Sequence, residues 1–114
     1  MKRNFQALGR LKSGRMNKTE AEYAGMLELR KRAGEIAWYA FEAMKLRLAD
    51  NTFYTPDFTV MLASGEMQQH EVKGFWTDDA RVKIKVAADL FPFQFLAVKK
   101  VRGGAWERED FGGN

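Results

Sequence analysis

The residues best suited to chemistry in this chain are two carboxylates and a lysine, Asp57, Glu71 and Lys73. Glu71 and Lys73 are two positions apart, so on a β-strand their side chains share one face while Val72 points to the other. Oxygen ligands without histidine or cysteine favour Mg²⁺ or Mn²⁺ over zinc, and Mg²⁺ is commonly held by one or two carboxylates, water and substrate phosphates. These residues therefore predict metal-assisted hydrolysis of a phosphate ester, in which Lys73 orients the attacking water and offsets negative charge.

Whether Asp57 meets Glu71 depends on a predicted hairpin, whose strands and loop are residues 53–62, 63–65 and 67–73. A three-residue loop with a left-handed glycine places Leu62 opposite Glu66. Counting back along the ladder then places Asp57 directly opposite Glu71. A two-residue loop would instead pair Asp57 with Val72 and separate the carboxylates onto opposite faces. Facing carboxylates repel each other, and a bound divalent cation removes that cost. The alternative, which the spacing alone favours, is a solvated hairpin with an ordinary Glu–Lys pair.

The three-residue register also sorts the side chains of the hairpin by polarity. One face gathers apolar residues and is expected to pack in the core: Phe58, Val60, Leu62 and Val72. The other face gathers polar and charged residues: Asp57, Thr59, Gln69, Glu71 and Lys73. The polar face would therefore carry the candidate chemistry.

Local signals predict one helix before the hairpin and one after it. Thr19 as N-cap and Glu22 at position N3 form a capping box for the first helix, which Gly34 ends. The second helix runs over 79–90 and is capped by one of two residues, Thr77 or Asp78. Its apolar stripe is expected to contain Val82, Val86 and Leu90, widened by Ile84 and Ala88.

Further strands are expected at 41–48, where apolar and basic residues alternate, and at 93–99. The element order is then α-β-β-β-α-β, an α/β fold with a mixed central sheet flanked by helices. The chain divides into a basic N-terminal arm (1–16), a core domain (17–101) and a flexible C-terminal tail (102–114). The arm is either a solvated segment or a strap on a phosphate backbone.

The composition limits the classes of protein and partner. The chain has 114 residues, enough for one domain, and its 46% hydrophobic content is typical of a folded chain. The lack of cysteine excludes disulfides, thiolate catalysis and cysteine-ligated metals, and a single histidine excludes a histidine-rich centre. No apolar run is long enough to span a membrane and the basic start does not resemble a signal peptide, so we expect a cytoplasmic protein. The net charge of +4 suits a polyanionic partner without requiring one.

Two segments around the candidate residues resemble the signature of the PD-(D/E)XK nuclease superfamily: Tyr54-Thr55-Pro56-Asp57-Phe58 and His70-Glu71-Val72-Lys73-Gly74. The upstream helix with its acidic residues strengthens the resemblance, since that superfamily usually opens with such a helix before three strands. Three stretches are more closely similar to a family of small phage-encoded members of this superfamily: Asn17 to Tyr23, Ala33 to Ile36, and Glu71 to Asp78.

The resemblance implies a restriction-endonuclease-like core and a role for each matched residue. The ligands of Mg²⁺, or of Mn²⁺ in its place, would be Asp57, Glu71 and the Val72 carbonyl. Lys73 would be the catalytic lysine. Glu20 would be the helix acid that reaches the metal through water, with Glu22 as its rival. Helix capping and dipole pairing explain either glutamate equally well.

We therefore predict a metal-dependent DNA endonuclease of phage or prophage origin, acting in the cytoplasm of a bacterial host. Its small surface favours a homodimer, and family analogy favours branched or junction DNA. The predicted DNA contacts are basic residues: Arg10, Lys12, Arg81, Lys83 and Lys85. For the last three, a solvated helix face is the alternative. Two other functions stay open: a non-catalytic DNA-binding module, and a phage protein that acts by binding a host enzyme.

Overall fold

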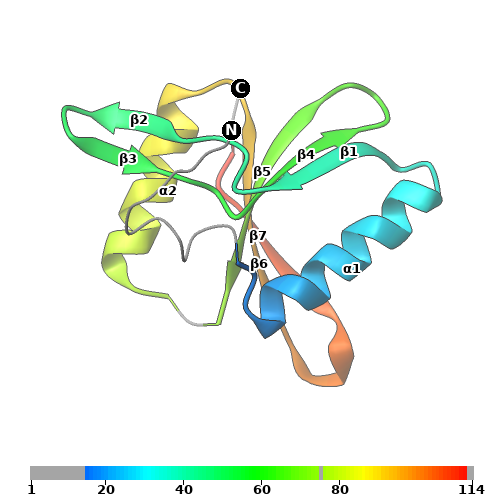
Figure 1. The fold of residues 1–114 in the computed structure, drawn as a ribbon. Helices are drawn as coiled ribbons and strands as arrows, with labels where there is room; N and C mark the ends of the chain where they lie inside the picture. Colours follow the sequence, from blue (N-terminus) through cyan, green and yellow to red (C-terminus); the bar gives the residue numbers. More distant parts are fainter. Residues whose placement is uncertain (1–14, 75, 113–114) are drawn as a thin grey trace.

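The computed structural model describes residues 15–74 and 76–112, so Arg10 and Lys12 of the predicted basic arm lie outside the described residues. A five-stranded sheet has the order β1-β4-β5-β6-β7, and β2 and β3 form a separate two-stranded sheet (Figure 1). The strands are β1 (Ile36–Phe41), β2 (Leu46–Ala49), β3 (Thr52–Tyr54), β4 (Phe58–Leu62), β5 (Met67–Lys73), β6 (Gln94–Lys100) and β7 (Trp106–Asp110). The helices are α1 (Lys18–Arg32), α2 (Asp78–Leu90) and the short 3₁₀ helix η2 (Arg102–Gly104).

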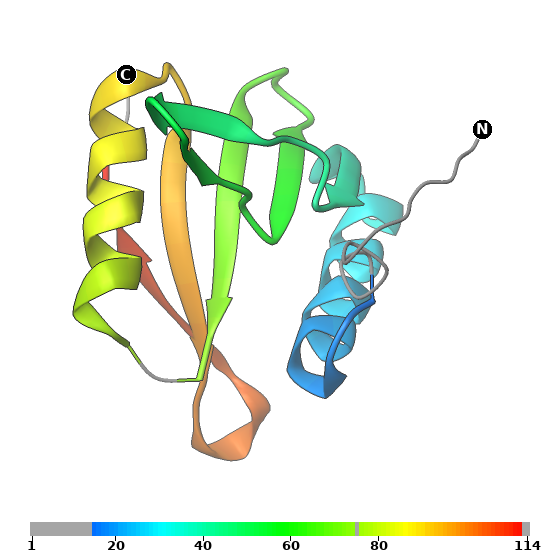
Figure 2. The ribbon, with the colours of Figure 1, turned by 60° about the vertical axis from the view of Figure 1, so that its left-hand side comes forward.

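The five-stranded sheet is mixed and is covered on both faces. β5 and β6 run parallel, whereas the other neighbouring strands are antiparallel. Helix α1 packs on one face, and α2 together with the β2–β3 hairpin covers the other (Figures 1 and 2). The predicted α/β class, with a mixed central sheet flanked by helices, is confirmed.

The N-cap of α1 is Asn17, and the predicted N-cap Thr19 is wrong. The Asn17 side chain accepts a hydrogen bond from the Glu20 N–H, and the Glu20 carboxylate accepts one from the Asn17 N–H, each at 2.8 Å. Asn17–Glu20 and Thr19–Glu22 both fit the spacing of a capping box. Glu22 is instead paired with Lys100, at the end of β6, at 2.7 Å, so a tertiary contact decides between the two.

The strand expected over 41–48 is also wrong. The chain is extended on both sides of a break at 42–45, where Glu42 has a φ of 49°. The run of aromatic and aliphatic residues before the break forms β1, and the alternation after it belongs to β2, whose Leu46 is buried against α2. Alternation of apolar residues identifies a strand but not the sheet to which it belongs.

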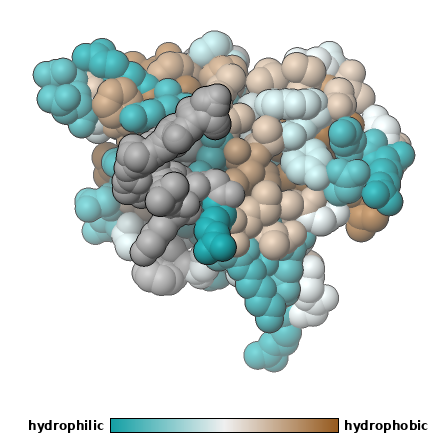
Figure 3. Space-filling model, in the orientation of Figure 1, coloured by the Kyte–Doolittle hydropathy of each residue, from teal (hydrophilic) through white to brown (hydrophobic). Residues whose placement is uncertain are grey.

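The strand expected over 53–62 divides into β3 and β4 at residues 55–57. Pro56 has no N–H to donate to a neighbouring strand, so a continuous ladder cannot pass through it. The separated β2–β3 hairpin packs beside α2, and its exposed turn at Asp50 and Asn51 points into solvent. Figure 3 shows hydrophilic surface over the tip of this hairpin, at the upper left.

The predicted register of the β4–β5 hairpin is confirmed. The Leu62 N–H donates to the Glu66 carbonyl at 2.8 Å, and Gly65 has the expected positive φ, 92°. The ladder then pairs successive residues from Met61↔Met67 to Phe58↔His70. One further step along this register brings Asp57 opposite Glu71.

Both faces of this hairpin lie in buried environments. The predicted apolar face packs under α1, with Phe58 and Val60 fully buried. On the opposite face, Thr59 donates a hydrogen bond to the Gln69 side chain at 2.7 Å, and both residues are fully buried. The charged side chains of this face, Asp57, Glu71 and Lys73, are half-buried at the end of the hairpin away from its turn.

The buried stripe of α2 differs from the prediction. Its N-cap is Thr77, one of the two residues predicted for that position. Of the residues expected in the core, Val82, Val86 and Leu90 are 57%, 37% and 53% exposed, whereas Ile84 and Ala88 are buried as predicted. The buried face consists of Ile84, Ala87 and Ala88. The helix carries two apolar stripes, and the one with two alanines allows the closer approach to the sheet.

The prediction of a flexible tail from residue 102 is wrong for 102–110. Gly103 and Gly104 both have positive φ, at 89° and 84°, and form a tight turn after β6. β7 then pairs antiparallel with β6, and the Trp106 ring packs edge-on against Tyr23 of α1, with centroids 4.9 Å apart. Within the described part of the chain, no helix is long and apolar enough to cross a membrane.

Candidate active site

The structure brings Asp57, Glu71 and Lys73 together at the end of β5. Asp57 lies just before β4, and its Oδ2 accepts a hydrogen bond from the Val72 N–H at 2.8 Å. The Lys73 Nζ lies 3.2 Å from the Glu71 Oε2, and the two side chains are 22% and 12% exposed. The three residues predicted from the sequence are therefore neighbours, and the ammonium group is held against a largely buried carboxylate.

The backbone of Val72 faces the same place. In a strand, the N–H and C=O of one residue point toward the same neighbouring strand. Since the Val72 N–H donates to Asp57, its carbonyl also points to the side of β4. Continuing the β4–β5 register sets Val72 opposite Pro56, which has no N–H to donate. The Val72 carbonyl thus lacks a ladder partner at that position, as the predicted ligand role requires.

Burial, and after it the negative charge of Glu71, raise the pKa of Asp57 to about 8, against the hydrogen bond from Val72, which lowers it. Two carboxylates are thus held close together where both cannot easily stay ionised. A divalent cation between them would remove this repulsion, so the donor set fits Mg²⁺ or Mn²⁺. Across residues 15–74 and 76–112, no group of three or more His, Cys, Asp or Glu residues forms a candidate metal site. Water and phosphate oxygens would have to complete the coordination of the cation.

Glu20 and Glu22 differ in their surroundings. Glu20 closes the capping box of α1, yet its charge also contributes to the raised pKa of Asp57. Glu22 is paired with Lys100, which lowers the pKa of Glu22. Glu20 therefore caps α1, and its charge also acts on Asp57 in the candidate site.

We expect Glu20→Gln to lower any cleavage activity more than Glu22→Gln does, by about 10–100-fold, the usual cost of losing a group that supports a metal site. Glutamine still accepts the capping hydrogen bond, so α1 should stay intact. Single-turnover cleavage rates of the two variants, with circular dichroism as a control for folding, measure the difference. A larger loss in Glu22→Gln would transfer the role to Glu22.

The sequence did not identify Tyr54 as part of this site. Its hydroxyl donates a hydrogen bond to the Glu71 Oε1 at 2.7 Å. Burial and the charge of Glu71 both raise the pKa of Tyr54, so the phenol stays protonated and remains a donor. Glu71 is thus held by Tyr54 on one oxygen and by Lys73 on the other. The only signal for Tyr54 was its position two residues before Pro56, at the end of β3.

His70 lies on β5 next to Glu71 but faces the opposite side of the sheet. It is fully buried, and its ring nitrogens contact the Tyr23 hydroxyl at 2.6 Å and the Gln68 side chain at 2.8 Å. Burial lowers the pKa of His70 to about 3, so the ring is neutral. His70 therefore supports the packing of α1 and does not belong to the candidate active site.

The three basic residues predicted on α2 have different environments. The Arg81 guanidinium donates to both carboxylate oxygens of Glu109 on β7, one at 3.1 Å, and lies over the rings of Trp76 and Phe111. These contacts join α2 to β7, so the Arg81 side chain already has its partners within the protein. Lys83 and Lys85 are both exposed, but only Lys83 lines a cavity next to Glu71.

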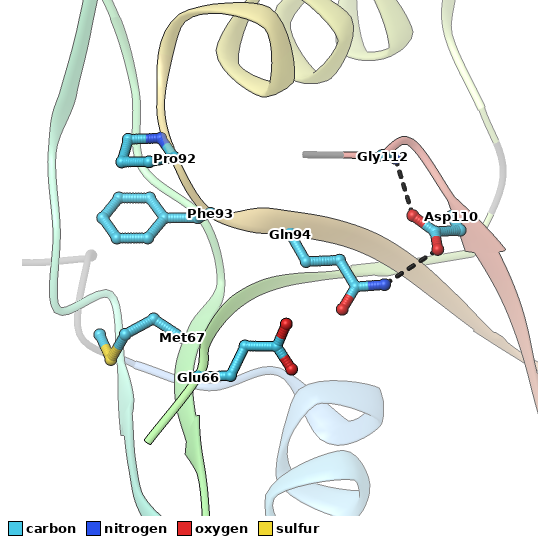
Figure 4. Close-up of a pocket in the computed structure, with 7 residues that line it drawn as sticks. All are labelled: Glu66, Met67, Pro92, Phe93, Gln94, Asp110 and Gly112. Carbon is cyan, nitrogen blue, oxygen red and sulfur yellow. Dashed lines mark hydrogen bonds between the residues drawn. The ribbon is translucent and has the colours of Figure 1, made fainter. Parts of the chain in front are cut away.

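That cavity has a volume of about 280 Å³ and lies between the start of α2 and the ends of β3 and β5. It is lined by Tyr54, Thr55, Glu71, Lys73, Asp79, Ala80 and Lys83. A second cavity, of about 450 Å³, lies at the other end of β5, beside Glu66 and Gln94 (Figure 4). Its two carboxylates, with no basic residue among the described residues that line it, make it unsuitable for a phosphate group, whereas the smaller cavity is lined by Lys73 and Lys83.

Comparisons of the chain with protein-family models, with curated proteins and with solved structures found no match. The functional interpretation therefore rests on the geometry described above and on the resemblance of its sequence motifs.

Proposed function

We propose that this protein is a metal-dependent DNA endonuclease that hydrolyses phosphodiester bonds. The observation that carries the proposal is the placement of Asp57 opposite Glu71, with Lys73 3.2 Å from Glu71, beside a cavity that also contains Lys83. Two facing carboxylates, which raise the pKa of Asp57, are costly to maintain in the absence of a cation. A metal ion bound by the two carboxylates would explain why the protein keeps them so close together, and a bound phosphate would explain the lysine beside them.

Each residue then has a distinct task. Asp57, Glu71 and the Val72 carbonyl would hold Mg²⁺ or Mn²⁺, and Tyr54 keeps the Glu71 carboxylate in a fixed orientation. When bound, the metal supplies a water of lowered pKa and polarises the scissile phosphate. Lys73 provides a positive charge where negative charge develops during attack on phosphorus. The preorganised donors Tyr54 and Lys73 avoid the cost of reorienting the site during the reaction.

The resemblance to small phage-encoded nucleases completes the proposal. It favours branched or junction DNA as substrate and the cytoplasm of a bacterial host as the place of action. A chain of 114 residues offers little surface to DNA, so a homodimer that cuts both strands fits the size of the protein. The net charge of +4 favours association with a polyanion.

We expect cleavage of DNA in Mg²⁺ or Mn²⁺ and none in a chelator, tested with linear, nicked, single-stranded and four-way-junction DNA. Glu71→Gln, prepared in the same way, is the control for contaminating nucleases and should not cut. DNA binding without cleavage of any substrate in either metal would favour the non-catalytic DNA-binding module. A lack of DNA affinity at low salt would favour the protein-interaction factor.

A further inference from the structure

The cavity beside Glu71 is built from two parts of the fold. Tyr54, Thr55, Glu71 and Lys73 come from the ends of β3 and β5, and α2 contributes Asp79, Ala80 and Lys83. Lys83 lies four residues after Asp79 and three after Ala80, so its side chain neighbours both of them on the helix surface. The small Ala80 side chain leaves room between the lysine and the strands.

Lys83 differs from three of the cations near this site, which each have a carboxylate partner. Lys73 is paired with Glu71, Arg81 with Glu109 and Lys100 with Glu22. Over the described ranges, Lys83 forms neither an ion pair nor a hydrogen bond. A lysine on the wall of a cavity with no protein partner has its charge available to an anion, and phosphate is a common partner for such a point charge.

The size of the cavity limits what it can hold. At about 280 Å³ it is close to the lower end of the roughly 300–1,000 Å³ typical of small-molecule sites, so it suits one nucleotide unit and not several. It shares Glu71 and Lys73 with the candidate active site. A nucleotide whose scissile phosphate lies at Glu71 and Lys73 would therefore extend from there into the cavity, with its next phosphate able to reach Lys83.

We propose that this cavity binds the phosphate group adjacent to the scissile one on the same DNA strand, with Lys83 as its ligand. The proposal rests on the proposed nuclease function. Asp79, on the same wall, carries the opposite charge and disfavours an anion on its side of the cavity. The bound phosphate is thereby confined to the side of Lys83.

Binding of thymidine 3′,5′-bisphosphate and thymidine 5′-monophosphate, measured by calorimetry in Mg²⁺, tests this assignment. The parent should bind the bisphosphate more tightly, because only this probe can supply a second phosphate to Lys83. Lys83→Met should weaken bisphosphate binding about five- to tenfold, as expected for one charge-assisted contact, and leave monophosphate binding unchanged. Asp79→Asn should tighten bisphosphate binding about two- to threefold by removing a repulsive charge.

Lys85→Met is the matched control, since Lys85 lies on the same helix, carries the same charge and does not line the cavity. It should bind both probes as the parent does. Equal weakening in Lys83→Met and Lys85→Met would overturn the assignment, as would a parent that binds the bisphosphate no better than the monophosphate. Neither measurement requires cleavage. A parent that cuts no DNA but shows the Lys83-dependent preference would overturn the nuclease function and retain the phosphate site.

Discussion

Replacing Lys73 with methionine is expected to reduce DNA cleavage by about 10²–10³-fold while DNA binding stays within a few-fold of the parent. Lys73 acts on charge that develops in the transition state, so its loss affects the rate far more than ground-state affinity. Methionine retains much of the aliphatic stem, which lies beside the Trp76 ring, with Nζ 5.6 Å from the ring centroid. The variant should therefore fold normally, and its metal affinity should persist or increase because a positive charge has been removed.

Single-turnover cleavage and equilibrium DNA binding, measured on the same preparations, separate these effects. Lys99→Met is a suitable control, because Lys99 pairs with Lys73 in the β5–β6 register but has no ion pair with a described residue. It removes the same charge from the neighbouring strand and should leave the rate within a few-fold. If Lys73→Met cuts as fast as the parent, the catalytic role of Lys73 is wrong. An equal loss of cleavage rate in Lys99→Met would show that the rate depends on the total positive charge nearby and not on Lys73 in particular.

Asp57→Asn is expected to stabilise the metal-free protein at alkaline pH. The pKa of Asp57 rises from its usual 3.8 to about 8 on folding. Its contribution to stability is therefore fully present below pH 3.8 and is lost as the pH rises through 8. Asparagine is uncharged and can still accept the hydrogen bond from Val72. At about 1.4 kcal/mol per pKa unit, the full rise corresponds to about 5 kcal/mol at pH 8, so the free energy of unfolding should increase there by at least about 2 kcal/mol, and the difference from the parent should shrink toward zero near pH 4.

Urea denaturation at pH 4 and pH 8 measures this effect, and adding metal ions reverses it. A cation that binds only the folded parent stabilises it by about 2.7 kcal/mol at 100 times its Kd, whereas Asp57→Asn should gain little. Asp79→Asn is the control: Asp79 is exposed at the start of α2, so its loss should change stability by less than about 1 kcal/mol. A parent that Mg²⁺ and Mn²⁺ do not stabilise would contradict the metal site. An Asp57→Asn variant less stable than the parent at pH 8 would contradict the repulsion between the carboxylates.

The sequence by itself determined the parts of this protein that depend on neighbouring residues. Gly65 permits the positive φ of a three-residue loop, and the loop sets the register that brings Asp57 opposite Glu71. The two-residue spacing of Glu71 and Lys73 on a strand places both side chains on one face. These features follow from backbone geometry over a few residues, which is why they could be predicted without knowing what else packs nearby.

The tertiary structure alone decided which surfaces meet. The sequence placed Ile84 and Ala88 at the margin of the apolar stripe of α2, and contact with the sheet buried these two residues together with Ala87 and left Val86 at the margin. Tyr54 reaches Glu71 only because the chain breaks at Pro56 and folds the β2–β3 hairpin over the sheet. The pKa of Asp57 rises because segments distant in sequence bury it and place Glu71 beside it. Burial and electrostatic interaction depend on distances in space, which local sequence patterns do not specify.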